Sequence, residues 1–472
     1  MTSSLLSRPV LVAGAGVSGS SCARVLTELG VRVTVADNNL EALARLEKEY
    51  GVATTSPEEV TDWTQFGLVV TSPGWNPASP LLTAAVNAGV EVIGDVELAY
   101  RLDEAETYGP KRTWLVVTGT NGKTTTTGML ASIMQQATFR TGKVATAVGN
   151  IGVSLFDALA ARERVDILVA ELSSFQLHWS STLRPDAGML LNLAEDHIDW
   201  HGSFEHYAQS KAKALRGKVA IIGEDAAVLA QVSRLRESGE VADAVYRFTA
   251  STPESGAVGV IEGELVDNGV GAPEATTLTP VEGIEPAGLA GILDAAAAAA
   301  LARTQGVSRD EVAAGLASYK VAGHRGVKVA TKSGVDFIDN SKATNPHAMA
   351  AALSGLSRVV LIAGGQLKGA DLRPDLSDNI HQLTSIVAFG QDRELVATAA
   401  REVSAAKGLD LPVIVVEGEE PEDTMREVVA VAAQHAEEGD TVLLAPAGAS
   451  LDMYTGMAQR GEMFSAAVHA LN

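Results

Sequence analysis

The stretch Trp114–Thr125, with the sequence WLVVTGTNGKTT, decides how the middle of this chain folds. Its first five residues form an apolar, β-branched run, which is typical of a buried parallel strand. Glycine-rich residues then interrupt the strand, and a helical pattern runs from Thr126 to Gln136. A strand, a glycine-rich loop and a helix in this order predict a phosphate-binding loop at the carboxyl edge of a parallel sheet.

The residue types of this loop suggest its chemistry. Backbone N–H groups at such a turn point at phosphate oxygens, and the helix N-terminus adds a partial positive charge. Lys123 is expected to reach the β- and γ-phosphates of a nucleotide, and the Thr124 hydroxyl to bind Mg²⁺. The longer motif GxxxxGK[ST] is incomplete because Val117 stands where its first glycine belongs, and a glycine-rich turn that only starts a helix is the alternative. The expected ATP-binding residues of the loop are Gly119, Thr120, Asn121, Gly122, Lys123, Thr124 and Thr125.

Apolar runs alternate with helical patterns along nearly the whole chain, which predicts an α/β protein with mostly parallel sheets. We expect three domains: a Rossmann-like N-terminal domain (1–110), a P-loop-type central ATPase domain (111–320) and a Rossmann-like C-terminal domain (321–472). From Arg247 to Pro286 the pattern weakens, which suggests a small antiparallel excursion, and the alanine-rich run 295–302 predicts a helix packed closely on a sheet. The expected strands are Pro9–Ala13, Val31–Ala36, Leu68–Thr71, Val90–Ile93, Trp114–Thr118, Ile167–Ala170, Gly188–Leu191, Val335–Ile338, Val359–Ala363, Ile386–Phe389, Val413–Val416 and Val442–Leu444.

Composition limits the function classes. The 472 residues include 36 Lys and Arg against 58 Asp and Glu, a formal net charge of −22, and 46% of them are apolar. Such a chain is not globally disordered, and it is a poor general binder of nucleic acid or anionic membranes. The single cysteine, Cys22, excludes an intramolecular disulfide and fits a reducing compartment. Met1–Gly19 lacks a signal-peptide pattern and no apolar run is long enough for a membrane span, so we expect a cytoplasmic protein.

A second glycine loop opens the chain. Gly14–Gly19 (GAGVSG) follows the first expected strand, and Asp37 ends the next one. This spacing is the fingerprint of a dinucleotide site, in which the acid contacts a ribose hydroxyl. Because the loop recognises a diphosphate and a sugar, a UDP-sugar fits it as well as NAD does. A tight turn without a ligand is the third possibility.

Two polar groups follow strands of the central region. The strand Ile167–Ala170 runs directly into Glu171, and a carboxylate at a strand end beside a phosphate loop is where a nucleotide metal is held. His197 follows the next strand in a polar loop, where a metal-ligand or catalytic role is as plausible as a structural one. An exposed strand-end acid is the alternative for Glu171.

Four separated motifs together resemble the Mur ligases, and the resemblance covers nearly the whole chain. The loop Gly119–Thr125 is similar to that family's G-T-x-G-K-T, and Asp339–Asn345 (DNSKATN) resembles the S-K-A-T-N signature of the D-glutamate-adding branch. The other two are Leu361–Gly365 with the KGAD that follows it, and Pro446–Asp452 (PAGASLD) with RGE at 460–462. Four matches in order are far more specific than any one of them.

The resemblance implies an ATP-dependent amide ligase of peptidoglycan precursor synthesis. Such an enzyme activates the carboxylate of UDP-N-acetylmuramoyl-L-alanine as an acyl phosphate and joins it to D-glutamate. The resemblance also implies ATP and one or two Mg²⁺ as cofactors, these two small-molecule substrates as the partners, and a monomer. Lys211 resembles the family's carbamylated lysine, whereas the sequence alone favours a surface helix lysine.

The same resemblance implies the roles of individual residues. Asp294 stands in for part of the family's usual His-Asn-x-x-Asn element, where this chain has AGILD at 290–294. The implied catalytic residues are Lys123, His197, Lys211 and Arg325. The implied metal ligands are Thr124, Glu171, His197 and Lys211. The implied ATP contacts outside the loop are Asp294, Arg325, Asn340 and Lys342. The implied substrate contacts are Val17, Ser18, Asp37, Ser72, Pro73, Gly74, Asn150, Thr344, Lys368, Ser450 and Leu451.

Three other functions stay open at this point. The first is another amide ligase of the same superfamily, which adds a different amino acid or extends folate; Ser341–Asn345 argues against it. The second is an NAD-dependent oxidoreductase resting on Gly14–Gly19 and Asp37, which leaves Gly119–Thr125 unexplained. The third is a nucleotide-regulated binding protein without ligase activity, which the missing His-Asn element permits.

Overall fold

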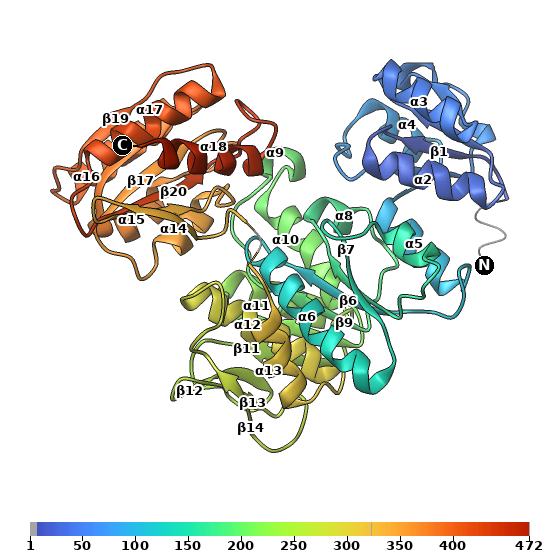
Figure 1. Ribbon diagram of the computed structural model, residues 1–472. Helices are drawn as coiled ribbons and strands as arrows, with labels where there is room; N and C mark the ends of the chain where they lie inside the picture. Colours follow the sequence, from blue (N-terminus) through green and yellow to red (C-terminus); the bar gives the residue numbers. More distant parts are fainter. Residues whose placement is uncertain (1–6, 322, 472) are drawn as a thin grey trace. The chain divides into compact units, whose positions relative to one another are not determined.

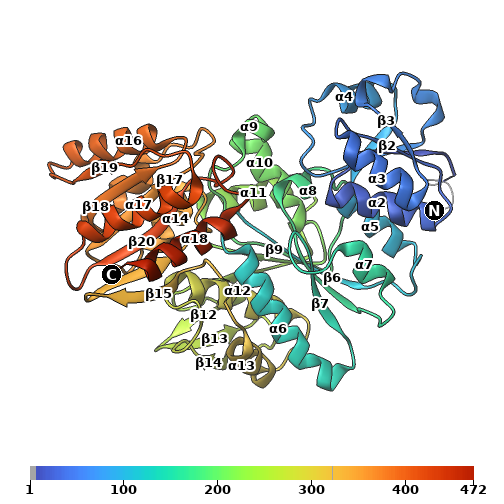
Figure 2. The same ribbon diagram turned by 45° about the horizontal axis from the view of Figure 1, so that its top comes forward.

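The computed structural model describes residues 7–321 and 323–471 (Figures 1 and 2). The chain forms two compact units. The first unit comprises the chain up to Leu193 with Glu205–Glu282 and Leu293–Tyr319, and the second comprises Ala194–Phe204, Gly283–Ile292 and the chain from Lys320 onward. The expectation about Met1–Gly19 falls partly on residues 1–6, which lie outside the described residues. No helix in the described ranges is long and apolar enough to cross a membrane.

The first unit starts with a parallel five-stranded sheet in the order β3-β2-β1-β4-β5. All residues of β1 and β4 are buried, as expected of apolar strands covered on both faces. Four of the five strands match the sequence prediction to within two residues; only the short β3 was not predicted. The strands are β1 (Val10–Ala13), β2 (Val33–Ala36), β3 (Ala53–Thr55), β4 (Leu68–Thr71) and β5 (Glu91–Gly94). The helices are α2 (Val17–Glu28), α3 (Leu40–Tyr50), α4 (Pro80–Asn87) and α5 (Asp95–Glu104).

The first unit also holds a nine-stranded sheet in the order β14-β13-β12-β11-β10-β9-β6-β8-β7. The seven neighbouring strands β7, β8, β6, β9, β10, β11 and β12 are parallel. Strands β13 and β14 add an antiparallel edge, which confirms the predicted antiparallel excursion. The strands are β6 (Thr113–Thr118), β7 (Ala145–Gly149), β8 (Ile167–Glu171), β9 (Ala187–Leu190), β10 (Val219–Ile222), β11 (Ala244–Phe248), β12 (Ala257–Ile261), β13 (Glu264–Asn268) and β14 (Thr276–Pro280).

The helices around this sheet include the two that the sequence predicted. The helix after the phosphate loop is α6 (Lys123–Thr141), and the alanine-rich helix is α12 (Leu289–Thr304). Every residue from Ala295 to Ala302 is fully buried, which small side chains permit because they let a helix approach its neighbours closely. The remaining helices are α7 (Leu155–Ala160), α8 (Ser174–His178), α10 (Phe204–Ala212), α11 (Ala226–Glu237) and α13 (Arg309–Ser318).

The second unit is built on a six-stranded sheet in the order β15-β16-β20-β17-β18-β19. Only β15 runs antiparallel to its neighbour. One face packs on α14, α15 and α16, and the other on α17 and α18, which Figure 1 shows on opposite sides of the sheet. The strands are β15 (Val327–Lys332), β16 (Val335–Asp339), β17 (Val359–Gly364), β18 (Leu383–Phe389), β19 (Val413–Val415) and β20 (Thr441–Ala447). The helices are α9 (Ile198–His201), α14 (Pro346–Leu353), α15 (Arg373–Asn379), α16 (Arg393–Ala406), α17 (Pro421–Gln434) and α18 (Met457–Ala470).

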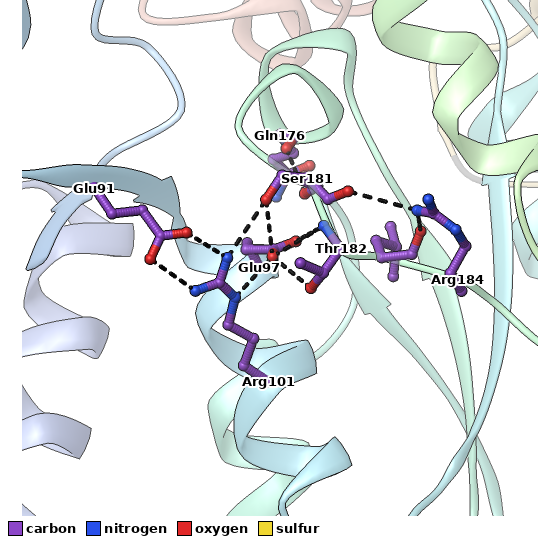
Figure 3. A network of polar contacts seen from close by, with 9 residues as sticks. Glu91, Glu97, Arg101, Gln176, Ser181, Thr182 and Arg184 are labelled. Atoms are coloured by element: carbon purple, nitrogen blue, oxygen red, sulfur yellow. Dashed lines mark hydrogen bonds and ion pairs between the residues drawn. The ribbon is translucent and has the colours of Figure 1, made fainter. Parts of the chain in front are cut away.

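A buried carboxylate fastens α5 to the segment that follows α8 (Figure 3). The side chain of Glu97 is fully buried and accepts hydrogen bonds from the Thr182 backbone N–H and hydroxyl and from the Ser181 hydroxyl. Arg101 donates to the same carboxylate at 2.8 Å and also forms a two-point ion pair with Glu91 on β5. The network therefore ties the five-stranded sheet to the nine-stranded sheet within the first unit.

We expect Glu97→Ala to lower the free energy of unfolding of the first unit by about 2–4 kcal/mol, because it leaves the buried donors of Ser181 and Thr182 without their acceptor and Arg101 with Glu91 alone. Chemical denaturation followed by circular dichroism measures this. Glu91→Ala is the matched control: its side chain is 45% exposed, so the loss is expected to stay below about 1 kcal/mol. Equal losses of unfolding free energy in the two variants would contradict the prediction that the buried carboxylate of Glu97 contributes more than the exposed one of Glu91.

Candidate active site

The phosphate loop lies between the end of β6 and the start of α6, as predicted. Gly122 precedes α6 with a φ of +81°, and a Cβ there would lie 2.4 Å from Asp294 Oδ1. A Cβ on Gly119 would lie 2.8 Å from Leu191 Cβ. Both positions therefore require glycine, for backbone geometry in the first case and for space in both. Lys123 Nζ donates to the Thr120 carbonyl at 2.7 Å, which holds the lysine against its own loop.

Two side chains outside the motif hold the loop in shape. Asn192 accepts from the Asn121 backbone N–H at 2.9 Å and donates to its carbonyl at 3.2 Å. The Tyr207 hydroxyl lies 2.8 Å from Thr120 Oγ1. The sequence analysis predicted no role for either residue. The position of Tyr207, one helical turn before Lys211, could have indicated its role, because residues four apart lie on the same face of a helix.

Lys211 lies beside the loop rather than on the surface. It is 2% exposed, and its Nζ donates to the Gly119 carbonyl at 2.7 Å, with Thr118 Oγ1 at 3.5 Å. The same Nζ lies 5.0 Å from the centre of the Tyr207 ring. The interpretation as a surface helix lysine is wrong, because α10 turns this side chain toward the edge of the sheet.

Glu171 ends β8, whose neighbour β6 leads into the loop, and Val117 is its partner in the register. The residue is 1% exposed, which rules out the alternative of an exposed strand-end acid. Asn150 Nδ2 donates to Oε1 at 2.8 Å, while the buried Oε2 has no hydrogen-bond partner among the described residues. A buried carboxylate oxygen without a donor suits a hard cation.

Asp294 on α12 lies at the other side of the loop. It is 9% exposed, and its Oδ1 accepts a hydrogen bond from Thr126 Oγ1 at 2.9 Å. The structure thus brings this predicted ATP contact next to Gly122. Thr124 is half-buried at the first turn of α6, and Thr125 is buried.

The N-terminal glycine loop is fixed by Asp37. One carboxylate oxygen accepts from the Ala15 N–H at 2.6 Å and the other from the Asn39 N–H at 2.8 Å. Val17 on this loop is 86% exposed, and the Ser72 N–H pairs with the Ala13 carbonyl, so β1, β2 and β4 bring these predicted contacts to one sheet edge. The predicted neighbours Ser18 and Pro73 are half-buried at that edge, and Gly74 is exposed.

The second unit brings three predicted segments to the carboxyl edge of its sheet. Gln366 and Ala449 exchange backbone hydrogen bonds at 2.9 and 2.8 Å, which places the loop of Lys368 beside that of Ser450. Lys368 is exposed with a φ of +54°, whereas Ser450 is buried and Leu451 is 69% exposed. The third segment is Asp339–Asn345, in which the predicted residues Asn340, Lys342 and Thr344 are half-buried.

Two further predicted residues belong to the second unit. His197 precedes α9 with a φ of +54°, and its Nε2 lies 3.6 Å from Asp196 Oδ1. Arg325 is half-buried and follows His324, whose Nδ1 lies 2.6 Å from Asp339 Oδ2. Their catalytic roles stay predictions.

A glycine loop between strand and helix, flanked by a buried lysine and a buried carboxylate, defines a phosphate-loop nucleotide-binding protein. Comparison with protein families is more specific. The chain belongs to the Mur ligase family, and it is an ATP-dependent ligase. The N-terminal domain of MurD-like Mur ligases matches residues 8–94, the Mur ligase middle domain 117–256, and the Mur ligase glutamate ligase domain 324–448.

Curated relatives match over nearly the full chain. A UDP-N-acetylmuramoylalanine–D-glutamate ligase of Corynebacterium diphtheriae is 53% identical over 97% of this chain and 95% of its own length. The corresponding ligase of Nocardia farcinica is 43% identical over 99% of this chain and 97% of its own length. The oxidoreductase alternative has no support among these relatives.

Solved structures share the fold at low identity. The MurF ligase of Thermotoga maritima, in complex with ADP, aligns with a TM-score of 0.56 and 17% identity over 98% of this chain and 99% of its own. The UDP-N-acetylmuramate-alanine ligase MurC of the same organism gives 0.55 and 18%, with the same coverage. These similarities confirm the predicted α/β class with mostly parallel sheets.

Proposed function

We propose that this chain joins D-glutamate to UDP-N-acetylmuramoyl-L-alanine at the expense of ATP, in the synthesis of peptidoglycan precursors. The observation that carries the proposal is the 53% identity, over 97% of the chain, to a ligase named for that reaction. The loop at β6–α6 and its buried neighbours supply the chemistry that such a reaction requires. We further propose a cytoplasmic monomer with domains over 1–110, 111–320 and 321–472.

The first chemical step has to overcome repulsion between anions. A carboxylate is a poor electrophile, so the γ-phosphoryl group of ATP is transferred to it, which gives an acyl phosphate and ADP. The amine of D-glutamate then attacks the carbonyl carbon, and phosphate leaves. Two unit charges 4 Å apart repel by about 1 kcal/mol in water and about 4 kcal/mol at an effective dielectric of 20. The γ-phosphate carries more than one charge, so cations are needed at this position.

The first unit offers these cations around its phosphate loop. Lys123 leaves the Thr120 carbonyl and binds the β- and γ-phosphates, while the loop N–H groups hold the chain of phosphates in line. Glu171 Oε2 and the Thr124 hydroxyl are the groups that fit Mg²⁺, which, when bound, neutralises phosphate oxygens. The described residues hold no group of three or more His, Cys, Asp or Glu suited to a metal. This agrees with a Mg²⁺ site that draws on few carboxylates and on the phosphates.

The remaining predicted residues divide between the nucleotide and the two substrates. Carbamylated Lys211 provides an anionic oxygen beside the phosphate loop. His197 acts as a metal ligand and catalytic residue. Asp294, Arg325, Asn340 and Lys342 contact ATP. The UDP end is bound by Val17, Ser18, Asp37 and Ser72–Gly74, with Asn150 toward the sugar and peptide. D-Glutamate is bound by Thr344, Lys368, Ser450 and Leu451.

The test is ADP release by the purified chain with ATP, Mg²⁺ and UDP-N-acetylmuramoyl-L-alanine. We expect release with D-glutamate and little with L-glutamate, D-alanine or L-lysine. Release with another amino acid instead, or with a folate as the acceptor, would replace the proposal by a different amide ligase. No release with any pair, despite nucleotide binding, would indicate a binding protein.

Lys368→Ala is expected to raise the KM for D-glutamate about 10- to 100-fold, because a charge-assisted hydrogen bond to a carboxylate contributes about 1.5–3 kcal/mol. The KM for ATP should change by less than about twofold. Steady-state kinetics with each substrate varied in turn measures both. Lys407→Ala, which removes an exposed lysine of the same unit, is the control. An unchanged KM for D-glutamate would remove Lys368 from the pocket.

A further inference from the structure

Arg460 is a buried cation without a carboxylate partner. It lies in the first turns of α18 and is fully buried. Among the described residues no ion pair within 4.0 Å joins its guanidinium to a carboxylate, which is unusual for a buried arginine, although the charges of Asp339 and Asp452 act on it from farther away. Burial lowers the pKa of Arg460 to about 10, so the side chain still carries its proton at neutral pH. Because a buried charge without an ion pair lowers the stability of the fold, we expect Arg460 to do more than fill space in the core.

Its partners are two loops at the carboxyl edge of the sheet. Nε donates to Ser341 Oγ at 3.0 Å and Nη2 to the Ser341 carbonyl at 2.8 Å, while Nη1 donates to the Gly448 carbonyl at 3.1 Å. Ser341 follows β16, and Gly448 follows β20, the neighbouring strand. The planar guanidinium therefore bridges two adjacent loops, as its fork of donors allows.

A third loop touches the same guanidinium. A Cβ on Gly365, just after β17, would lie 3.1 Å from Arg460 Nη1 and 2.1 Å from the Ala449 carbonyl. Only glycine fits at this point, where its φ is +97°. Arg460 thus lies where the ends of β16, β17 and β20 meet.

These loops need such support because their backbones are strained. Ala447 and Lys368 both have left-handed conformations, with φ of +60° and +54°. Non-glycine residues hold such angles only when surrounding contacts determine them. Two further hydrogen bonds hold the loop that contains Ser341. Asp339 Oδ1 accepts from the Ser341 N–H at 2.9 Å, and Ser341 Oγ donates to the Met457 carbonyl at 2.8 Å.

We propose that Arg460 is a positioning residue that sets the spacing of the three loops carrying Thr344, Lys368 and Ser450, and so determines affinity for the dicarboxylate amino acid. The inference rests on the proposed function for the identity of that ligand.

The kinetic test compares Arg460→Lys with the wild type. A lysine is a point donor that bridges the two loops poorly. We expect the KM for D-glutamate to rise about tenfold or more, which corresponds to about 1.4 kcal/mol, while the KM for ATP and for the UDP precursor change less than about twofold. Phe464→Leu is the matched control, since it loosens the packing of the same helix in the core between the sheet, α17 and α18. A selective rise in Arg460→Lys alone supports the proposal. An unchanged KM, or the same change in Phe464→Leu, overturns it.

A readout without activity separates this proposal from the proposed function. Hydrogen–deuterium exchange of the peptides that cover 340–345 and 446–451 should speed up together in Arg460→Lys and stay slow in Phe464→Leu. If the wild type releases no ADP with D-glutamate, the proposed function fails, and this exchange pattern still decides the positioning role. If Arg460→Lys does not fold, Ser341→Ala, which removes the hydroxyl that accepts from Arg460 Nε and donates to the Met457 carbonyl, should raise exchange in both loops. Unchanged exchange in that variant overturns the proposal.

Discussion

Replacing Lys123 with Met is expected to lower kcat by about 10²–10³-fold, because the transferred phosphoryl group loses a fixed positive charge in a site with little water. The ammonium group now lies 2.7 Å from the Thr120 carbonyl, at the end of a half-buried side chain within reach of a bound phosphate. The fold should survive, since the methionine retains the length of the stem. ADP release under saturating substrates measures kcat, and thermal unfolding checks the fold.

Lys143→Met is the control for this prediction. Lys143 is exposed just beyond the end of α6, so its loss removes one positive charge without touching the loop. Its kcat should match that of the wild type. Equal activity in both variants would remove the loop lysine from the mechanism and would leave the loop as a structural turn.

Lys211→Ala is expected to abolish turnover almost completely, and added bicarbonate should not restore it. In the proposed modification the amine nitrogen bonds to the carbon of CO₂ and releases a proton, which converts a cation into an anionic oxygen donor. An unmodified ammonium has no acceptor for a metal ion. The position of Lys211 supports the prediction, because a 2% exposed side chain with its Nζ 2.7 Å from the Gly119 carbonyl lies directly beside the phosphate loop.

Carbon-13 NMR with labelled CO₂ tests the modification itself. We expect one carbamate signal in the wild type and none in Lys211→Ala. Lys213→Met is the control, because Lys213 is a second inward-facing amine, two residues on, whose pKa burial lowers to about 8. A carbamate signal that vanishes only in Lys213→Met would place the modification on Lys213 instead of Lys211. Full turnover in Lys211→Ala would show that Lys211 is not needed for the reaction.

Local sequence pattern predicted the fold where strands are long and apolar. Strand β6 and helix α6 were predicted from the WLVV run and the glycine loop, and β12 to β14 supplied the antiparallel excursion. Strand β3 was missed because three partly exposed residues give no periodic signal, and β7 because ATAVG consists of small residues with Val148 as its one larger apolar side chain.

The candidate site could be predicted only as far as its motifs extend. Asn192 and Tyr207 fix the phosphate loop from 71 and 87 residues away, and Arg460 reaches Ser341 across 119. Such contacts depend on which strands become neighbours in the sheet, and no local pattern encodes that order. The buried positions of Lys211 and Glu171 depend on tertiary packing in the same way.

The hydrogen bond between Thr126 and Asp294 bears on how the chain is made. The two residues are 168 positions apart. A ribosome that adds about 5–20 residues per second therefore incorporates Asp294 about 8–34 s after Thr126. During that interval the nascent nucleotide loop lacks α12, with its buried alanines, and the acid that faces Gly122. Premature termination before residue 289 should therefore yield a polypeptide that cannot complete its first unit and is open to degradation.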